Sequence, residues 1–555
     1  MTDPAGEADT IVLPVATDDA ATVTLQPALT EVPSLRKASG SMLVAGVFSK
    51  TTGFARNLVI AWVIGLSVTA DAYNAANTLP NQVYELLVGG VLTSVMVPVL
   101  VRAHDDDADG GTVYTQRLLS MATIVLVVVT ALAVLASPLL TALVVDDSTG
   151  RANPNLTTAF AYLLLPQILF YGLSALFTAV LNAKHVFGVT VWAPVLNNIV
   201  LLITFGIYPL LPGEMTLNPV RMNDAHLLVL GIGSTLGVLG QVLMLLPFLF
   251  RSGFRFKWRW GWDRRFAEFG KLALWTIGYA LLAQIGVVVV TNVATANSGL
   301  AIYNNVWLLV QLPYGVIGFS LITAILPRMS RAAAQHHPEE IKNDLSLANR
   351  LCTVTMLPLS ALMTVLGPSV GIALFSVGKG HADAGRLGVA LAVAAFGALP
   401  YAITLIQLRV FYAMNDARTP TFVMIVMMAV KAVLSYLAPD VLSPAHVVYA
   451  LTFVNSLIFV VGWLAGEIWL RAKLGRLGSR ALVRTVAKSL LASLAAAGAA
   501  LLIRLLMPSG APGAWLALGV GGLVGIAVAL GTLLLLKTEE LQPVMHRIGR
   551  LAGRN

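Results

Sequence analysis

The feature that most constrains this chain is a series of fourteen long apolar segments joined by short polar connections. Each segment is close to or above the roughly 20 apolar residues with which a helix crosses a bilayer. Transmembrane β-strands would instead alternate apolar and polar residues over about ten positions. The pattern predicts an all-α polytopic membrane protein with helices over 40–65, 73–101, 117–144, 156–182, 188–210, 226–250, 268–296, 302–327, 347–377, 386–413, 420–438, 445–470, 482–507 and 513–537.

Composition supports the same class. Charged residues make up only 11% of the 555 residues, hydrophobic residues make up 57%, and the mean hydropathy is +0.81. Soluble domains carry roughly 25% charged residues, so most of this surface must face lipid. Cys352 is the single cysteine, which excludes an intramolecular disulfide and a cysteine-based metal cluster. We expect no metal and no cofactor, while coupling to an ion gradient or to the membrane potential stays open.

The net charge of +9 is distributed by side of the membrane. If the N-terminal tail, every second loop and the C-terminal tail share one side, that side holds 27 of the 36 Lys and Arg residues. The opposite side holds four, and five are assigned to helix interiors, with the basic residues at the cytoplasmic ends of other spans counted among the 27. The positive-inside rule then predicts cytoplasmic N- and C-termini and an even number of spans. We interpret the basic charge as topology and contact with membrane lipids, with no nucleic-acid partner.

An internal similarity organises the chain into halves. Pro166 and the segment 182–184 (Asn-Ala-Lys) correspond, 234 residues later, to Pro400 and the segment 416–418 (Asp-Ala-Arg). Parallel repeats are a transporter architecture with substrate between the halves, although chance similarity of apolar helices is the alternative. The predicted organisation is a disordered cytoplasmic tail (1–35), an N-terminal six-helix lobe (36–265), a C-terminal six-helix lobe (266–475), two additional transmembrane helices (476–540) and a basic cytoplasmic tail (541–555).

Ionisable residues inside the predicted spans are candidates for function, because each costs at least about 2.5 kcal/mol at the centre of a bilayer. The basic ones are Lys50, Arg56, Arg409, Lys431 and Arg504. We expect Arg504 to snorkel or to bind lipid. Arg409 could equally bind substrate or anchor its helix near the cytoplasmic face. The sequence indicates no particular role for Lys431.

Lys50 and Arg56 lie in one span on either side of Gly53. A regular helix places them about 120° apart, and a bend at Gly53 would turn both toward one cavity. Such a pair suits an anionic, phosphorylated substrate, because guanidinium binds phosphate through two hydrogen bonds. The alternative is that Arg56 pairs with Glu85 and holds the bundle together, while Asp71 lies at the outer mouth of the second helix.

Helix-breaking residues mark two of the predicted spans. In the second span, Leu79-Pro80-Asn81 precedes Gly89-Gly90, and in the eighth, Leu312-Pro313 precedes Gly315 and Gly318. Broken membrane helices generally line cavities, where the freed backbone groups find water or protein partners.

The motifs in these spans resemble the MurJ/MviN family. The matching stretches are 52–56 (Thr-Gly-Phe-Ala-Arg), 70–73 (Ala-Asp-Ala-Tyr), 79–81 (Leu-Pro-Asn), 97–98 (Val-Pro) and 409–420, which begins Arg-Val-Phe-Tyr-Ala. Their order and the fourteen spans extend the resemblance over about residues 36–540. The resemblance implies a lipid II flippase of the multidrug/oligosaccharidyl-lipid/polysaccharide exporter superfamily in the bacterial plasma membrane.

By position, the resemblance implies roles at the substrate site for Arg56, Lys50 and Asp71. We expect substrate-binding residues at these positions and at Glu85, Asn81 and Arg409. At two positions where better-studied members of the family carry arginine, this chain has Tyr84 and Leu308. Some members bind sodium near the eleventh helix, and Lys431 argues against such a site here. The resemblance further implies alternating access, a groove for the polyprenyl tail in the last two helices, and partners in cell-wall elongation or division.

Two other functions compete with this interpretation. The chain could flip another polyprenyl-linked polysaccharide, whereas a drug antiporter would favour acidic cavity residues. A membrane glycosyltransferase would need catalytic acids or a large external loop, and the sequence contains no convincing nucleophile–base pair. We therefore expect a transporter and not an enzyme.

Overall fold

The computed structural model describes residues 33–85, 100, 103, 107–184, 186–261, 265–335, 337–414, 416, 418–477 and 479–541. Within this part every regular element is a helix, as the apolar segments predict. The predicted tails at 1–35 and 541–555 lie outside the described residues, apart from their inner ends. The predicted second span is described only to Glu85, apart from Leu100.

The helices fall into three groups along the chain. The N-terminal lobe consists of α1 (Pro33–Ile64), α2 (Val68–Glu85), α4 (Thr112–Leu135), α5 (Ser137–Val144), α6 (Pro154–Leu164), α7 (Gln167–Ala183), α8 (Gly188–Ile207), η2 (Tyr208–Leu210) and α9 (Ala225–Arg251). The C-terminal lobe consists of α10 (Arg265–Ala296), α11 (Leu300–Pro313), η3 (Tyr314–Gly318), α12 (Phe319–Ala334), α13 (Pro338–Phe375), η4 (Gly378–Ala382), α14 (Ala384–Ala394), η5 (Ala395–Gly397), α15 (Ala398–Ala413), α16 (Arg418–Val441) and α17 (Pro444–Leu474). The terminal group consists of α18 (Ser479–Leu506), α19 (Ala511–Leu516), η6 (Ala517–Gly521), α20 (Gly522–Leu535) and η7 (Glu539–Leu541).

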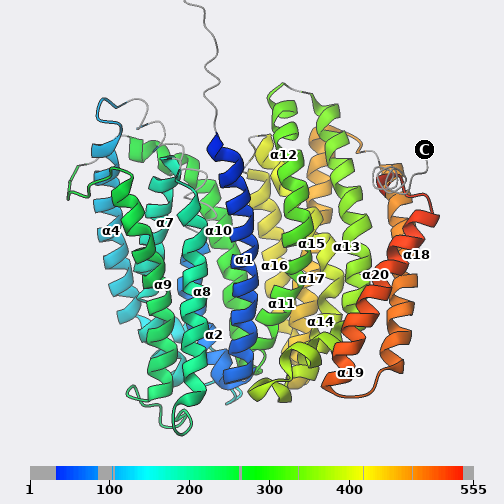
Figure 1. Ribbon diagram of the computed structural model, residues 1–555, viewed down its shortest axis with the longest axis horizontal. Coiled ribbons are helices and arrows are strands. Elements are labelled where there is room, and N and C mark those ends of the chain that lie inside the picture. Colours follow the sequence, from blue (N-terminus) through cyan, green and yellow to red (C-terminus); the bar gives the residue numbers. More distant parts are fainter. Residues whose placement is uncertain are drawn as a thin grey trace, which may run out of the picture.

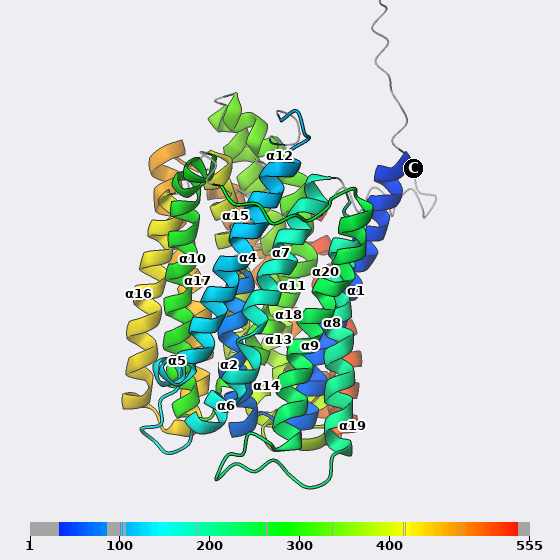
Figure 2. The ribbon, with the colours of Figure 1, turned by 90° about the vertical axis from the view of Figure 1, so that its left-hand side faces the viewer.

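The helices run mostly side by side (Figures 1 and 2), and many present apolar side chains outward. In the described part, ten helical stretches are long and apolar enough to cross a membrane, and Leu281–Ala296 is a shorter apolar helix. Exposed leucines such as Leu135 and Leu535 fit lipid contact rather than water. The multi-pass class is confirmed, while the number of fourteen spans stays a prediction.

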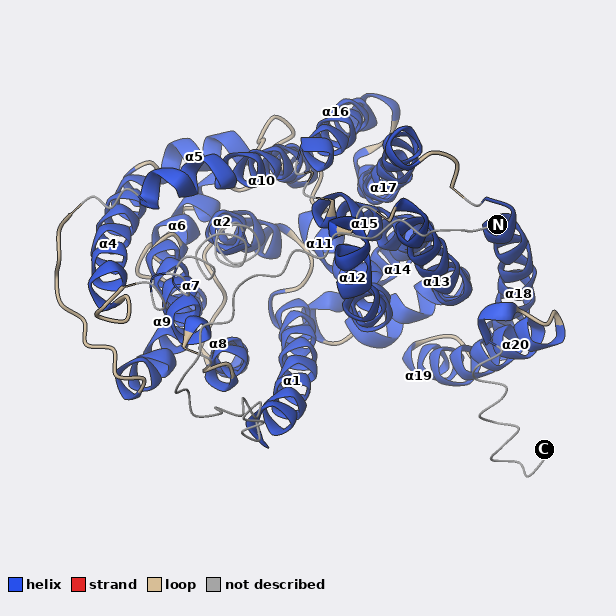
Figure 3. Ribbon diagram, turned by 90° about the horizontal axis from the view of Figure 1, so that it is seen from above, coloured by secondary structure: helices blue, strands red, loops and turns tan. Residues whose placement is uncertain are grey.

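Seen from above, the N-terminal lobe lies on one side and α11–α17 on the other, with α18–α20 at the far end (Figure 3). Helix α10 packs against α16 and also contacts α2 and α5, so it joins the two sides. We call the end of the bundle at which α1 begins the Pro33 face, and the end at which α1 finishes the Ile64 face. Figure 1 shows them at the top and the bottom.

Several predicted spans are interrupted. The eighth is divided by the π-helical segment η3, which contains Gly315 and Gly318 and follows Pro313, so the predicted break is confirmed. The fourth divides between α6 and α7 at Pro166, and the tenth divides at η5, shortly before Pro400. A proline lacks the N–H that would continue the ladder and clashes with the preceding turn. Such interruptions leave backbone carbonyls free for side chains from other helices.

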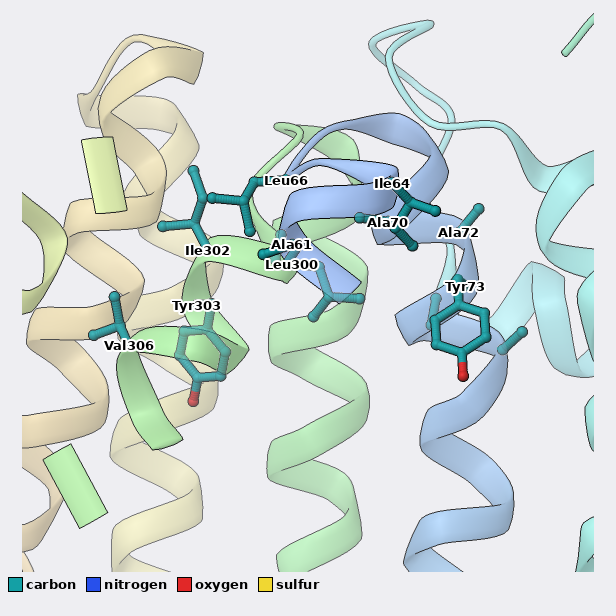
Figure 4. Close-up of a cluster of buried hydrophobic side chains, with 14 of the residues drawn as sticks. Ala61, Ile64, Leu66, Ala70, Ala72, Tyr73, Leu300, Ile302, Tyr303 and Val306 are labelled. Atoms are coloured by element: carbon teal, nitrogen blue, oxygen red, sulfur yellow. The ribbon is translucent and has the colours of Figure 1, made fainter. Parts of the chain in front are cut away.

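The largest buried apolar cluster lies at the Ile64 face and contains residues from both lobes. Figure 4 shows Ala61, Ile64 and Leu66 of the N-terminal lobe beside Leu300 and Ile302 of α11. All five are at most 3% exposed. Burial of this kind contributes roughly 25 cal/mol per Å² of apolar area, so it holds the lobes together at this face.

Candidate substrate-binding site

Arg56 lies in α1 and contacts the neighbouring helix α8. Its Nη1 donates to Oδ1 of Asn198 at 3.2 Å, and its Nη2 donates to Oδ1 of Asn57 at 3.4 Å. The Nε atom is buried without a hydrogen-bond partner. Among the residues that the structure describes, no carboxylate forms an ion pair with this guanidinium. Its described partners are neutral amides, so they orient the guanidinium without cancelling its positive charge.

Asn198 is a candidate site residue that the sequence analysis missed. Its Nδ2 donates to the carbonyl of Ser49 and to Oγ1 of Thr52, both at 3.2 Å. Gly53 faces the same amide, and a Cβ at Gly53 would lie 3.4 Å from Nδ2. The pair Asn197-Asn198 inside an apolar span was the available signal, because polar amides in membrane helices commonly bond across to another helix.

Lys50 contacts the opposite lobe. Its Nζ donates to the carbonyl oxygen of Gly315 in η3 at 2.8 Å, and the side chain is exposed. Helix α1 continues without interruption through Gly53. The two cations contact different lobes, and a bend of α1 at Gly53 stays a prediction. The near 120° separation of an unbroken helix accounts for this divergence.

Asp71 lies in the first turn of α2, not outside the helix as expected from a span beginning at residue 73. Its carboxylate is 4% exposed, and Oδ1 accepts from the backbone N–H of Ala301 at 2.7 Å. Ala301 is in the first turn of α11, where N–H groups lack partners within the helix. Asp71 thus provides an N-terminal cap from one lobe to a helix of the other, where a negative charge is favourable.

Asn81 and Glu85 follow along α2. Asn81 is half-buried, and its Oδ1 accepts from the hydroxyl of Tyr171 in α7 at 3.1 Å. It therefore makes a contact within the N-terminal lobe. Glu85 is the last residue of α2, and its side chain lies outside the described residues. The alternative pairing of Arg56 with Glu85 stays open.

Arg409 lies near the end of α15 and is exposed. It interacts electrostatically with three tyrosines, Tyr279 of α10, Tyr314 of η3 and Tyr412 of its own helix. Lys50 reaches η3 from α1, so the break in the eighth span brings both cations to one segment. Arg504, expected to snorkel or to bind lipid, donates to the carbonyl of Val365 in α13 at 2.9 Å, and its contact with lipid stays a prediction.

At the Ile64 face, the end of α1 is in close backbone contact with η4 and with the residues just before η4. Trp62 Nε1 donates to the carbonyl of Leu374 at 2.7 Å. Gly378 has a φ of +59°, and a Cβ there would lie 2.3 Å from the carbonyl oxygen of Trp62. Gly65 has a φ of +83° and faces Lys379. Only glycine accepts such conformations and approaches at low cost. We call the contact of residues 61–65 with 374–380 the Ile64 clasp.

Comparison with known proteins gives consistent results. The family model described as "Lipid II flippase MurJ" matches residues 60–521. The probable lipid II flippase MurJ of Vibrio cholerae is 26% identical over 408 residues, which is 70% of this chain and 74% of that protein. The corresponding protein of Haemophilus influenzae is 26% identical over 404 residues, covering 69% and 76%.

Solved structures show the same fold. A lipid II flippase MurJ in an inward closed conformation superposes with a TM-score of 0.72 at 18% identity, covering 91% of this chain and 99% of that one. An inward-facing multidrug resistance MATE family transporter of the MOP superfamily gives 0.59 at 14% identity, covering 78% and 98%.

Proposed function

The chain belongs to the lipid II flippase MurJ family, and we propose that it moves lipid II from the inner to the outer leaflet of the bacterial plasma membrane. In this proposal the pyrophosphate of the undecaprenyl-linked disaccharide-pentapeptide contacts basic side chains between the lobes. No bond of the substrate is made or broken. The lobes alternate in access, and the Pro33 face is cytoplasmic, as the positive-inside rule favours.

The observation that carries the proposal is the bonding of Arg56. A guanidinium inside an apolar bundle is normally paired with a carboxylate or serves a ligand. Arg56 is held by the amide oxygens of Asn198 and Asn57, which orient it without neutralising it. Hydrogen bonds to charged groups contribute about 1.5–3 kcal/mol, and guanidinium matches phosphate geometry. Arg56 is therefore suited to hold an anionic group.

Two further cations support the same site. Lys50 of α1 donates to the carbonyl of Gly315 in η3, where the eighth span is broken, and Arg409 of α15 interacts electrostatically with Tyr314 of the same segment. A π-helical break frees backbone groups and is frequent at functional sites. We infer that a phosphate moving along α1 toward the outer leaflet passes from these cations toward Arg56.

Alternating access requires the Ile64 clasp to open. Transporters of this architecture expose a central site to each side by rocking the repeats against each other. Here the Ile64 face is sealed by the apolar cluster, by the cap from Asp71 and by the Ile64 clasp. The contacts between lobes at that face must therefore be lost and remade in every cycle.

A reversible disulfide tests this requirement. A Cβ at Gly65 would lie 3.4 Å from Cβ of Lys379, close to the roughly 3.5–4.5 Å found in disulfides. We expect Gly65→Cys/Lys379→Cys, in a Cys352→Ser background, to stop flipping when oxidised and to recover when reduced. Each single variant is the control for strain at Gly65. Full flipping by the oxidised pair would contradict alternation at this face.

The substrate is tested in a bacterium depleted of its own flippase. We expect this chain to rescue growth and to restore lipid II exposure on the outer leaflet, and Arg56→Ala to do neither at equal membrane levels. Arg221→Ala, in an exposed loop, is the matched control. Well-expressed wild type that restores neither would shift the substrate to another polyprenyl-linked polysaccharide.

A further inference from the structure

Lys431 is a buried cation that the proposed flipping mechanism does not use. It lies in α16 and is 7% exposed. Its Nζ donates to Oδ1 of Asn455 in α17 at 3.0 Å and to the hydroxyl of Tyr303 in α11 at 3.3 Å. The Tyr303 hydroxyl in turn donates to the same Oδ1 at 2.7 Å. Three helices of the C-terminal lobe therefore meet at one amino group.

No carboxylate on these helices is placed to balance the charge. Helix α11 contains no acidic residue. Asp440 lies nine residues from Lys431 on α16, and Glu467 lies twelve residues from Asn455 on α17, or about 13 Å and about 18 Å along their axes. On α10, Gly286 faces Lys431, and Glu268 lies eighteen residues earlier, or about 27 Å.

The titratable side chains nearest to Lys431 are tyrosines, and one histidine lies farther away. Tyr303 contacts Lys431 directly, and Tyr279 of α10 packs against the methionines of α16 that precede it. Helix α17 contributes Tyr449 and His446, six and nine residues before Asn455. Arg409 of α15 interacts electrostatically with Tyr279. Among the described residues, the polar partners of the Lys431 amino group are Tyr303 and Asn455.

An amino group in this setting is stable in two forms. Burial without a counter-ion opposes the ammonium, because desolvation of an ion costs several kcal/mol. The two acceptors favour it, because hydrogen bonds to a charged donor are the stronger ones. Tyr303 and Asn455 provide these two acceptors for three N–H groups. The opposing effects allow a proton to be gained or lost with a modest change in free energy.

The same turn of α11 contacts the other lobe. Ala301 binds Asp71 of α2, and Tyr303, two residues later, binds Lys431. Just before α11, the carbonyl of Ala296 accepts from the hydroxyl of Thr149 of the N-terminal lobe. In Figure 4, Tyr303 extends from α11 near Leu300 and Ile302, which pack in the cluster at the Ile64 face. A change in the bonds of Tyr303 therefore acts directly on the contact between lobes.

We propose that Lys431 is a proton-binding site whose charge is coupled to the opening of the Ile64 face. The amine takes one proton from water to become an ammonium, and it returns that proton to water in another conformation. Tyr303 transmits the change to the first turn of α11 and so to the bond with Asp71. This inference rests on the alternation of the lobes proposed above and adds a proton to each cycle.

Distance measurement between the lobes tests the coupling. Spin labels are placed on the full chain in liposomes at Leu210→Cys and Val441→Cys, which are 80% and 79% exposed at the Ile64 face, with Cys352→Ser. Distances are recorded by double electron–electron resonance from about pH 5 to about pH 10, a range in which buried lysines titrate. We expect the closed-to-open ratio of the wild type to change by up to about tenfold per pH unit, the limit for one proton.

Three variants assign the response. Lys431→Met and Lys431→Arg should each give a pH-independent ratio at opposite extremes, because one is never charged and the other always is. Asp71→Asn tests whether Asp71, the other ionisable group at this contact, produces the pH response. Lys488→Met is the matched lysine control. If Lys431→Met fails to fold, Lys431→Arg decides the question. A wild-type ratio without pH dependence, or an unchanged response in a folded Lys431 variant, overturns the proposal.

Lipid II flipping without a pH gradient is measured on the same liposomes. Flipping by wild type together with a negative result for Lys431 refutes the proton site and leaves the flippase proposal intact. If folded, reconstituted wild-type protein does not flip lipid II, the result counts against the proposed function itself.

Discussion

The bonding of Arg56 in the N-terminal lobe and that of Lys431 in the C-terminal lobe differ in one instructive respect. Each cation donates to the Oδ1 atom of an asparagine on a neighbouring helix, Asn198 for Arg56 and Asn455 for Lys431. Arg56 is half-buried, whereas Lys431 is 7% exposed. A cation with an open side can meet a ligand, while an enclosed cation can exchange only a proton. The same pair of residue types therefore serves two purposes, according to burial.

The largest expected effect is that of Arg56→Ala on flipping. Removing a charge-assisted bond to the substrate costs about 1.5–3 kcal/mol, so the rate of lipid II flipping in liposomes should fall roughly tenfold to a hundredfold. Arg56→Lys should recover part of it, because an ammonium keeps the charge and loses the paired geometry. A rate within twofold of wild type for Arg56→Ala would remove the distinction drawn between the two cations.

Asp71→Asn should shift the balance between lobe conformations. The substitution removes a buried charge at the start of α11, and capping and dipole effects of this kind are worth about 1–2 kcal/mol. We expect the open Ile64 face to gain roughly five- to thirtyfold in population, measured with the labels at Leu210 and Val441. Asp383→Asn, at the same face, is the control. Equal distance distributions for wild type and Asp71→Asn would show that the cap does not hold the lobes.

Asn198→Leu tests whether orientation of Arg56 matters apart from its charge. The variant keeps the guanidinium and removes its acceptor, and one hydrogen bond contributes about 1 kcal/mol. We predict an approximately fivefold higher lipid II concentration for half-maximal flipping with an unchanged maximal rate. Asn197→Leu is the neighbouring control. An effect on protein yield alone would assign Asn198 a purely structural role.

The smallest effect, on stability, is expected at the ion pair of Lys473 with Asp416, which involves neither Arg56 nor Lys431. Partial burial acts to raise the pKa of Asp416, but the hydrogen bonds from Lys473 and Thr419 outweigh it and hold the pKa below the ordinary value of 3.8. The stability from this pair is present above that ordinary value and is lost as the pH falls through the lowered one. Thermal unfolding should show Asp416→Asn less stable by about 0.5–1 kcal/mol at pH 7 and equal to wild type in strong acid. A difference that persisted in strong acid would contradict the assignment.

Much of the architecture could be predicted from residue patterns. Long apolar runs indicated membrane helices, and Pro313, Gly315 and Gly318 marked the break that η3 confirms. Family motifs indicated the flippase family, which the family match over residues 60–521 confirms. The split of the fourth span at Pro166 was not predicted, because an apolar run has the same composition whether its helix is continuous or broken.

The candidate site was predictable only in part. Arg56, Lys50 and Asp71 were recognisable because charge in an apolar helix is rare and costly. Their partners were not recognisable, since Asn198 lies 142 residues from Arg56 and Gly315 lies 265 residues from Lys50. A bend of α1 at Gly53 stays a prediction, and the small residue also allows the approach of Asn198.

The sequence by itself determined the membrane class, the positions of the costly charges and the family. These follow from local chemistry, because the hydrophobic effect and the cost of buried charge act on each segment wherever it lies. Only the tertiary structure decided which lobe each cation contacts and which cation is enclosed. Those outcomes depend on how distant helices pack, and the same lysine or arginine has a different role beside an open space than within a closed core.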